Sequence, residues 1–339
     1  MGNLAIKVPR LVPKLVRGVI KFKVGTPSPL YAHYMVTGRC NMRCVFCDWW
    51  KMNVHELPTN EALSVIDEVC KLGAPFFHLS GGEPLLRKDL IILAKRAASH
   101  GCTVGMSTNA TLLKNSNVSE IADVFDYVVV SLDGPREIHD SHRGVKGTFD
   151  KAIEGIKLLK DLRVRVGVNT ILAPWNIEIL PEFIEWLQGF ADSLTIQPIH
   201  PYPPPAQNTP SPEAVSNIVD YLLKLKNKHP SFFAELSTDF IKGFKPFFEG
   251  KLPKLCHAGE LYIAINPEGK LLACASRTDI VLGDALTHSA SDLLREKTKN
   301  PEWLKVSTCK GCWLTCSAQS SITLQRPIRG ALSLVGIPF

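Results

Sequence analysis

Six short apolar segments that alternate with helical patterns constrain the fold of this chain more than any other feature. We expect strands at residues 31–36, 76–80, 103–107, 127–132, 164–172 and 194–198, and helices at residues 60–72, 89–100, 118–125, 149–162 and 177–190. Regular alternation is typical of a parallel sheet, in which functional residues collect at the carboxyl ends of the strands. The sequence therefore predicts an α/β fold with six strand–helix units. Thr59 and Thr148 are placed to cap two of the helices.

A loop with three cysteines follows the first predicted strand directly. Cys40, Cys44 and Cys47 have C-x3-C-x2-C spacing, and Phe46 stands just before the third cysteine. Three thiolates on one loop can bind one inorganic centre and leave a coordination position open, which permits chemistry at the metal. A structural zinc site or a set of buried free thiols is the alternative interpretation.

Length and cysteine usage limit the class of protein. A chain of 339 residues suits a large α/β core with an appendage. Eight of the ten cysteines fall in two groups and no secretory signal precedes them, so we expect metal binding in a reducing cytoplasm rather than a disulfide framework. The other two, Cys70 and Cys102, are predicted core residues. No apolar run reaches the roughly 18 to 20 residues that a spanning helix needs.

The formal net charge of +7 is unevenly distributed, because residues 1–47 and 303–339 contain basic residues and no acidic one. We expect a helix from Pro13 to about Phe22. Its apolar face would carry Val12, Leu15, Val16, Val19 and Ile20, and its opposite face would carry Arg10, Lys14, Arg17 and Lys21. Such a helix binds either an anionic membrane surface or the body of the protein. Nucleic acid is not an expected partner, because the basic residues alternate with aliphatic rather than aromatic side chains.

Further motifs follow the predicted strands in order. They are Gly81-Gly82-Glu83-Pro84 after the second strand, Thr108-Asn109-Ala110 after the third, Ser131-Leu132-Asp133 after the fourth, and His139-Asp140-Ser141-His142-Arg143-Gly144 beyond it. Together with the cysteine loop they resemble the radical S-adenosylmethionine (radical SAM) superfamily. The family's third motif is T-N-G, so Ala110 is a departure. The resemblance implies a partial (β/α)6 TIM-like barrel.

The resemblance also implies the cofactors. The thiolates of Cys40, Cys44 and Cys47 would hold a [4Fe-4S] cluster, and S-adenosylmethionine (SAM) would bind the remaining iron. Reductive cleavage of SAM would give a 5′-deoxyadenosyl radical that abstracts hydrogen from an unactivated C–H bond. A low-potential electron donor of the ferredoxin or flavodoxin type is then the expected protein partner.

Candidate SAM-binding residues are those that match the family's motifs near the strand ends. They are Phe46, Gly81, Gly82, Glu83, Asn109, Ser131, Arg143 and Asn169, with Gln197 as a further candidate. Glycines let a ligand amine approach backbone carbonyls, and the planar fork of Arg143 suits a carboxylate. The sequence assigns no residue to the hydrogen abstraction itself.

A second cysteine group lies in the last third of the chain. It consists of Cys256, Cys274, Cys309, Cys312 and Cys316, and residues 262–274 predict a β-hairpin that turns at residues 266–269. Gly269-x4-Cys274 followed by Cys309-x2-Cys312 resembles the twitch or SPASM extensions of radical SAM enzymes, which carry auxiliary [4Fe-4S] clusters. We expect one auxiliary cluster, held by Cys256, Cys274 and two of the last three cysteines. A structural zinc is the alternative.

These observations divide the chain into five parts. We expect a basic amphipathic segment at residues 1–27, the radical SAM core at 28–200, a proline-rich loop and helical linker at 201–255, an auxiliary cluster domain at 256–320 and an apolar basic tail at 321–339. The expected location is the cytoplasm, with the cytoplasmic face of the membrane as a candidate contact surface.

The substrate is the least constrained property. The basic amphipathic start and the apolar end favour a membrane lipid or isoprenoid. Maturation of a peptide or a tetrapyrrole is the alternative within the same enzyme class. A zinc-binding scaffold without catalysis is the alternative from a different class.

Overall fold

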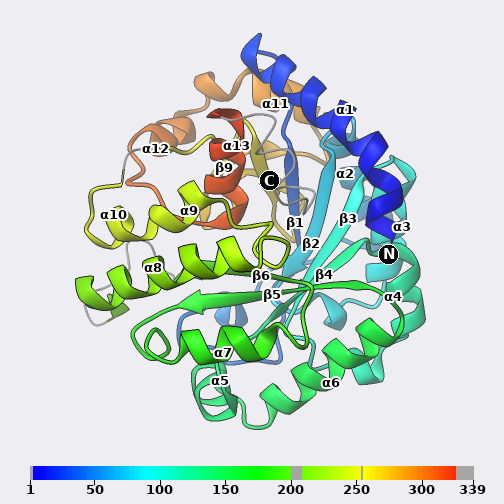
Figure 1. Cartoon of the computed structure of the whole chain (residues 1–339). Coiled ribbons are helices and arrows are strands. Elements are labelled where there is room, and N and C mark those ends of the chain that lie inside the picture. Colours follow the sequence, from blue (N-terminus) through cyan, green and yellow to red (C-terminus); the bar gives the residue numbers. More distant parts are fainter. Residues whose placement is uncertain (1–2, 200–207, 253–254, 326–339) are drawn as a thin grey trace.

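The computed structural model describes residues 3–199, 208–252 and 255–325. Within these residues one sheet has the strand order β6-β5-β4-β3-β2-β1-β7-β8-β9. The strands are β1 (Tyr31–Thr37), β2 (Phe76–Gly81), β3 (Thr103–Thr108), β4 (Tyr127–Ser131), β5 (Arg165–Leu172), β6 (Ser193–Pro198), β7 (Tyr262–Ile265), β8 (Lys270–Cys274) and β9 (Arg277–Asp284). Because β1 to β6 are parallel neighbours in chain order, the predicted α/β fold with a partial (β/α)6 barrel is confirmed (Figure 1).

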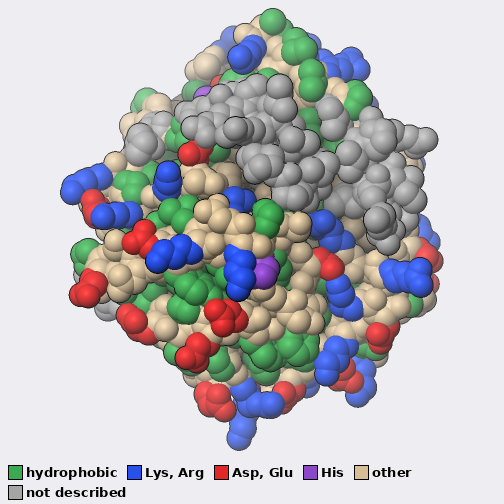
Figure 2. Space-filling view, viewed as in Figure 1, with side chains coloured by type: hydrophobic (Ala, Val, Ile, Leu, Met, Phe, Trp, Pro, Cys, Tyr) green, Lys and Arg blue, Asp and Glu red, His purple; other side chains and the backbone are tan. Residues whose placement is uncertain are grey.

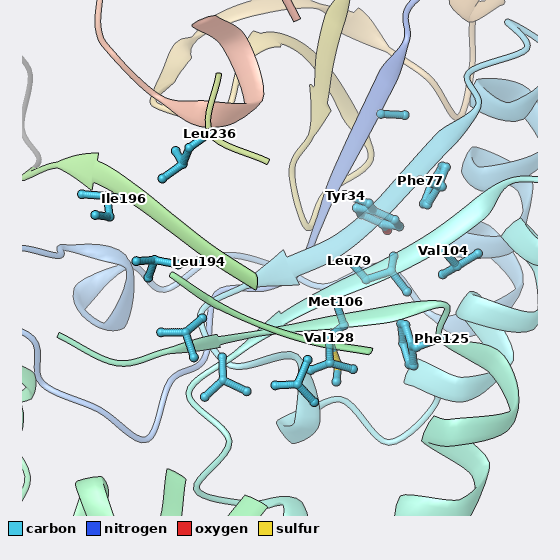
Figure 3. Packing of buried hydrophobic residues seen from close by; sticks show 14 of the residues in the cluster. Tyr34, Phe77, Leu79, Val104, Met106, Phe125, Val128, Leu194, Ile196 and Leu236 are labelled. Atoms are coloured by element: carbon cyan, nitrogen blue, oxygen red, sulfur yellow. The ribbon is translucent and has the colours of Figure 1, made fainter. Parts of the chain in front are cut away.

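Helices cover the outer face of the curved sheet. They are α2 (Thr59–Cys70), α3 (Leu90–Ser99), α4 (Val118–Val124), α5 (Arg136–Arg143), α6 (Thr148–Asp161), α7 (Leu180–Leu187) and α8 (Pro212–Lys228). The strand residues that face these helices are apolar and fully buried, as Leu79, Val104, Val128 and Ile196 illustrate (Figure 3). Successive strand residues point to opposite faces, so the residues between them face the barrel interior, which we call the lumen.

Helix α1 (Asn3–Lys23) begins ten residues before the predicted start at Pro13. Leu11 and Leu15 are buried against Leu30, Phe76 and Leu261, at the amino ends of the central strands. Burial of a leucine contributes about 1.5–3 kcal/mol, which favours a helix on the protein body here. The side chains of Arg10 and Val12 are not among those the structure describes.

The predicted apolar face of α1 is therefore partly wrong. Val16 and Ile20 are 51% and 57% exposed although they share that predicted face with Leu15. Figure 2 shows hydrophobic and basic side chains next to one another at the upper end of α1. Among the described helices, none combines the length and the apolarity needed to cross a bilayer.

Two predicted helix caps are also wrong. Helix α2 starts at Thr59 itself, after Pro58, without a side-chain cap. Helix α6 starts at Thr148, and the carboxylate of Asp140 from α5 accepts hydrogen bonds from the backbone N–H groups of Gly147 (2.6 Å) and Phe149 (2.8 Å). A cap contributed by a neighbouring helix satisfies the same free N–H groups that a local side chain would.

The C-terminal part continues the barrel sheet instead of forming a separate one. Strand β7 pairs in parallel with β1, and β7, β8 and β9 follow as antiparallel neighbours. The predicted hairpin is confirmed, because the N–H of Gly269 donates to the carbonyl of Asn266 at 3.0 Å. Around it lie α9 (Thr238–Lys242), α10 (Phe244–Phe248), α11 (Ala290–Arg295), α12 (Leu304–Ser307), a π-helical turn (Thr315–Gln319) and α13 (Ser320–Gln325). The predicted domain boundaries stay predictions.

Candidate active site

The three-cysteine loop lies where β1 ends, at the carboxyl edge of the barrel. Its backbone is tied to the last turn of α5: the N–H groups of Arg43 and Val45 donate to the carbonyls of Arg143 and His142 at 3.1 and 3.0 Å. Gly144, which ends α5, has a φ of +72°, and a Cβ there would lie 2.3 Å from the carbonyl oxygen of Arg43. A glycine is therefore required where the helix end meets the loop.

The thiols of this loop influence one another electrostatically. Burial is the main cause that raises the pKa of Cys40 to about 11, and Cys44 and Cys47 contribute to the rise. Three thiolates at this spacing repel one another unless a cationic centre binds them. In the described part of the chain, no three Cys, His, Asp or Glu side chains meet closely enough to hold a single metal ion. Three cysteine thiols on one loop are the type of donor that iron–sulfur clusters use.

The glycine motif after β2 packs directly against the cysteine loop. A Cβ at Gly81 would lie 2.3 Å from the carbonyl oxygen of Thr37, and one at Gly82 would lie 2.1 Å from that of Arg39. The N–H groups of Gly82 and Glu83 donate to these same two carbonyls, each at 2.8 Å. Any side chain at either glycine would push the two loops apart.

Glu83 joins the ends of β2 and β3. Its fully buried carboxylate accepts from the hydroxyl of Thr108 (2.7 Å) and from the N–H groups of Asn109 (2.8 Å) and Leu85 (3.1 Å). Burial raises the pKa of Glu83 to about 7, although these hydrogen bonds oppose the rise. The side chain of Asn109 continues the connection, since it donates to Asn41 of the cysteine loop at 2.8 Å.

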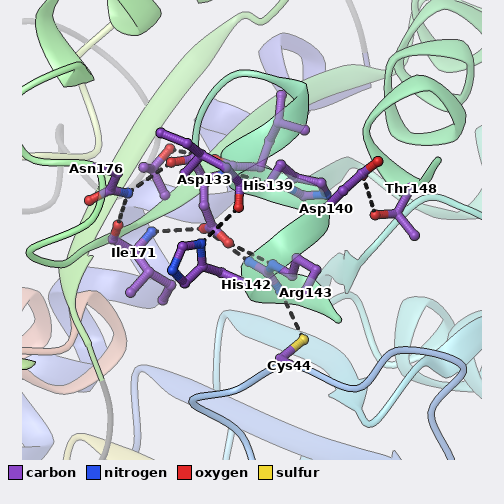
Figure 4. Close-up of polar contacts among 12 residues, drawn as sticks. Cys44, Asp133, His139, Asp140, His142, Arg143, Thr148, Ile171 and Asn176 are labelled. Atoms are coloured by element: carbon purple, nitrogen blue, oxygen red, sulfur yellow. Dashed lines mark hydrogen bonds and ion pairs between the residues drawn. The ribbon is translucent and has the colours of Figure 1, made fainter. Parts of the chain in front are cut away.

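The arginine at the end of α5 pairs with a carboxylate of the chain itself. Arg143 donates to both oxygens of Asp133 at 2.6 and 3.0 Å, and its third nitrogen lies 4.0 Å from the sulfur of Cys44 (Figure 4). Burial alone would raise the pKa of Asp133, but the attraction of Arg143 more than offsets it and keeps that pKa low. The sequence predicted a bidentate role for Arg143, and the structure shows its partner to be Asp133.

An apolar wall lies beside this ion pair. Ile171, Ala173 and Ile199 are buried at the ends of β5 and β6, with Phe46 and Trp175 packed against them. The ring of Phe46 lies under the guanidinium of Arg143 at 5.1 Å, and Trp175 stacks on His142 at 4.2 Å. The planar side chains of Phe46, Trp175 and His142 can together support a planar ring such as a nucleobase.

A cavity of about 350 Å³ occupies the lumen. At its carboxyl end it is lined by Gly81, Asn169 and Gln197, and on the opposite side by Cys316 and Ser276. Asn169 accepts from the hydroxyl of Thr195 at 3.1 Å and is the strand neighbour of Ser131. The predicted SAM-binding residues therefore lie together at one end of the sheet, although what they bind stays a prediction.

The second cysteine group lies beyond β8, across the lumen from the first. Burial is the largest cause that raises the pKa of Cys274, and the nearby thiols of Cys312, Cys316 and Cys256 raise it further. Burial also raises the pKa of Cys316 to about 12, and the hydroxyl of Tyr262 hydrogen-bonds to its sulfur. The remaining thiol, Cys309, interacts with the guanidinium of Arg277.

The predicted core cysteines are buried as expected, with Cys70 and Cys102 7% and 3% exposed. Sequence reasoning missed the lumen side chains, which include Tyr31, His33, His78, Tyr127, Arg165, Glu235 and Tyr262. Most of them occupy every second position of an otherwise apolar strand, as in Tyr31-Ala32-His33 and Phe76-Phe77-His78-Leu79-Ser80. This period-two pattern of polar and aromatic residues was the available signal.

Comparison with known proteins supports the geometry. The family model described as "Radical SAM superfamily" matches residues 34–187. The Fe-coproporphyrin III synthase of Methanosarcina barkeri is 36% identical over 45% of this chain and 39% of its own length. The PqqA peptide cyclase of Bradyrhizobium diazoefficiens is 27% identical over 84% of this chain and 78% of its own length. The chain spans less than half the length of the curated relatives that it matches at 34–36% identity.

A solved structure shows the same fold over most of the chain. Streptococcus suis SuiB, in the crystal structure bound to the precursor peptide SuiA, superposes with a TM-score of 0.66 at 16% identity. The match covers 88% of this chain and 74% of SuiB. Because it covers 88% of this chain, the likeness in fold extends beyond the residues of the family match.

Proposed function

This chain belongs to the radical SAM superfamily, whose family model matches residues 34–187, and we propose that it is an enzyme that cleaves SAM and modifies a peptide. The observation that carries the proposal is the partly buried loop of three thiols, held by the glycine motif on one side and by α5 on the other. When bound, a [4Fe-4S] cluster would supply the electron that cleaves SAM to a 5′-deoxyadenosyl radical.

We infer that the chain's own residues do three things at this site. Cys40, Cys44 and Cys47 hold the cluster. The apolar wall with Phe46 and Trp175 supports the nucleoside, while Ser131 and Asn169 offer polar groups beside it. Asp133 fixes the orientation of the Arg143 guanidinium, whose remaining N–H donors, one of them 4.0 Å from the sulfur of Cys44, would be available to the carboxylate of SAM. These side chains are buried or half-buried, which would limit the access of water to the bound cofactors.

Two observations favour a peptide over a tetrapyrrole. The alignment with the peptide cyclase covers most of both chains, whereas that with the coproporphyrin synthase covers less than half of either. A tetrapyrrole also carries several carboxylates that need cationic partners. Among the described residues lining the lumen, Arg165 is the single cationic one, and it is already paired with Glu235 at 3.2 Å.

The lipid hypothesis finds no support. Helix α1, which suggested it, packs on the protein with Leu11 and Leu15, and the reported relatives are named for peptide or porphyrin chemistry. A low-potential ferredoxin or flavodoxin is proposed as the electron donor. We also propose that Cys256, Cys274, Cys312 and Cys316 hold an auxiliary cluster.

The test is anaerobic reconstitution followed by reduction with dithionite in the presence of SAM. The enzyme is expected to form 5′-deoxyadenosine, and Cys44→Ala is expected to form none. Co-expression with peptides encoded beside its gene is expected to give a peptide that has lost hydrogen, detected by mass spectrometry. A colourless protein that leaves SAM intact would refute the enzyme, and SAM cleavage with modification of porphyrin alone would refute the peptide.

A further inference from the structure

The lumen has a wall of aromatic rings. Tyr262 stacks on Tyr31 with centroids 5.9 Å apart, Tyr31 stacks on His78 at 5.7 Å, and His78 stacks on Tyr127 at 5.7 Å. The planes of successive rings are inclined to one another by 29–30°. We call these four residues the ring wall. Gly105 makes room for it, since a Cβ there would lie 2.1 Å from the ring of Tyr127.

The polar atoms of the ring wall are joined to other lumen side chains. His78 contacts the hydroxyls of Tyr127 (3.2 Å) and Ser107 (2.7 Å), and His33 contacts the hydroxyl of Tyr262 at 3.0 Å and that of Ser80. These contacts fix the rings in place. A rigid, pre-formed wall loses little conformational entropy when a ligand stacks on it.

The charges of the described protein side chains that line the lumen cancel. Burial lowers the pKa of His33 to about 4 and holds the pKa of His78 well below its ordinary value, so both imidazoles are neutral at neutral pH. The charged side chains among the described lining residues are Arg165 and Glu235. They pair with one another, and Glu235 also accepts from the hydroxyl of Ser193 at 2.8 Å. A charged ligand group that entered this space would lose its hydration without gaining a partner ion.

We propose that the lumen binds an uncharged aromatic ring of the substrate, packed against the ring wall of Tyr31, His78, Tyr127 and Tyr262. This inference rests on the proposed function in that the ring is taken to belong to the peptide. It adds that the residue to be modified, or its direct neighbour, has a neutral aromatic side chain and not a carboxylate, an ammonium or a guanidinium. Stacked pairs contribute about 0.5–1.5 kcal/mol beyond the area that they bury.

The proposal is tested by binding alone, without turnover. The full chain, reconstituted anaerobically with iron and sulfide and supplied with SAM, is titrated with four probes and followed by saturation-transfer NMR. The probes are p-cresol, p-toluate, 4-methylbenzylamine and 4-methylcyclohexanol, which differ in charge or planarity at similar size. We expect p-cresol to bind at least about tenfold more tightly than each of the others. If p-toluate binds as tightly as p-cresol, the lumen does not select against a charged group. If 4-methylcyclohexanol binds as tightly as p-cresol, the ring wall does not select for an aromatic ring.

Two variants locate the probe. In Glu235→Gln the charge of Arg165 loses its partner. The affinity for p-toluate should therefore rise about tenfold, while the affinity for p-cresol should be unchanged. The matched control is Asp67→Asn, which removes the partner of Arg96 on the outer surface. It should change neither the affinity for p-toluate nor that for p-cresol. Val129→Phe fills the lumen and should abolish p-cresol binding. If Glu235→Gln leaves p-toluate binding unaltered, the ring does not bind in the lumen and the proposal is wrong.

These outcomes are independent of the proposed activity. A protein that prefers p-cresol but modifies no peptide would refute the proposed function alone. A protein that modifies a peptide at an aliphatic or charged residue, with equal binding of all four probes, would refute the lumen proposal alone.

Discussion

At the residue scale, Glu83 is the clearest case of a side chain whose position serves several loops at once. It is fully buried, and each of its hydrogen bonds comes from a donor: one hydroxyl and two backbone N–H groups. A glutamine would place an amide NH2 against at least one of these donors. An unpaired buried donor costs about 1–3 kcal/mol.

The raised pKa of Glu83 predicts a pH dependence of stability. Its value of about 7 in the folded state lies above the ordinary 4.5, so between these values the folded state holds a proton that the unfolded state has released. The stabilising contribution is therefore present below about pH 4.5 and is lost as pH rises through 7. We expect the difference in Tm between wild type and Glu83→Gln to fall from about pH 5 to about pH 7 and to stay level above about pH 8.

The control for this measurement is Glu213→Gln, at an exposed position in the first turn of α8. Its Tm should follow that of the wild type across the range. A Glu83→Gln curve that also runs parallel to the wild type would show that Glu83 ionises in the folded state as it does in the unfolded chain.

The motif residues of the site were predictable because each is required by local geometry. Ala110 marks the limit: it holds a φ of +61°, a conformation that explains why the family pattern has glycine there. The tyrosines and histidines of the lumen were not predicted, because such a residue in a strand is most often a packing residue. Their role depends on the curvature that turns one face of the sheet into a cavity.

At the element scale, helix α1 shows which features of a helix the hydrophobic periodicity of a sequence can predict. The pattern correctly predicted a helix with an apolar side, but it placed Leu15 and Val16 on the same buried face. In the structure Leu15 is 1% exposed and Val16 is 51% exposed. Neighbouring residues differ by about 100° around a helix, so the exact contact line is set by the partner surface at Leu30, Phe76 and Leu261.

This difference predicts unequal effects of two adjacent substitutions. Leu15→Ala should lower the free energy of unfolding by about 2–4 kcal/mol, because it leaves a cavity under α1. Val16→Ala, the matched control, should change it by less than about 0.5 kcal/mol. Urea denaturation at equal iron content measures both. Similar losses for the two variants would mean that α1 packs with the face predicted from the sequence.

Strand positions were predicted to within one or two residues, since buried strands in a parallel sheet are continuous apolar segments. Helix starts were less predictable. The cap of α6 comes from Asp140, whose position next to Gly147 and Phe149 depends on the packing of α5 against α6. By contrast, the cap of α8 is local, because the hydroxyl of Ser211 accepts from the N–H of Ala214 within the first turn of the same helix.

At the scale of the whole molecule, the continuous sheet places residues of both candidate sites around one cavity. Strand β7 adds to the free edge of β1, so the hairpin that carries Cys274 becomes part of the barrel wall. Gly81 from the first site and Cys316 from the second both line the lumen. A substrate in the lumen would therefore lie between the two proposed clusters, an arrangement that requires the folded sheet and that cysteine spacing alone did not reveal.

The same arrangement predicts which cysteines matter for iron content. Cys274 is affected by the thiols of Cys256, Cys312 and Cys316, whereas Cys309 interacts with Arg277. With two [4Fe-4S] clusters the wild type should hold about eight irons per chain, and Cys274→Ala should hold about four. Cys309→Ala, its matched control, is expected to keep about eight, because the thiol of Cys309 interacts with the guanidinium of Arg277, although it also lies near Cys312.

Iron and sulfide analysis of anaerobically reconstituted protein measures these values, and electron paramagnetic resonance of the reduced protein shows which cluster remains. Cys44→Ala supplies the reciprocal case, in which the auxiliary signal is retained and the signal altered by SAM is lost. If Cys309→Ala loses as much iron as Cys274→Ala, then Cys309 is a ligand, and Arg277 must turn away from it when the cluster forms.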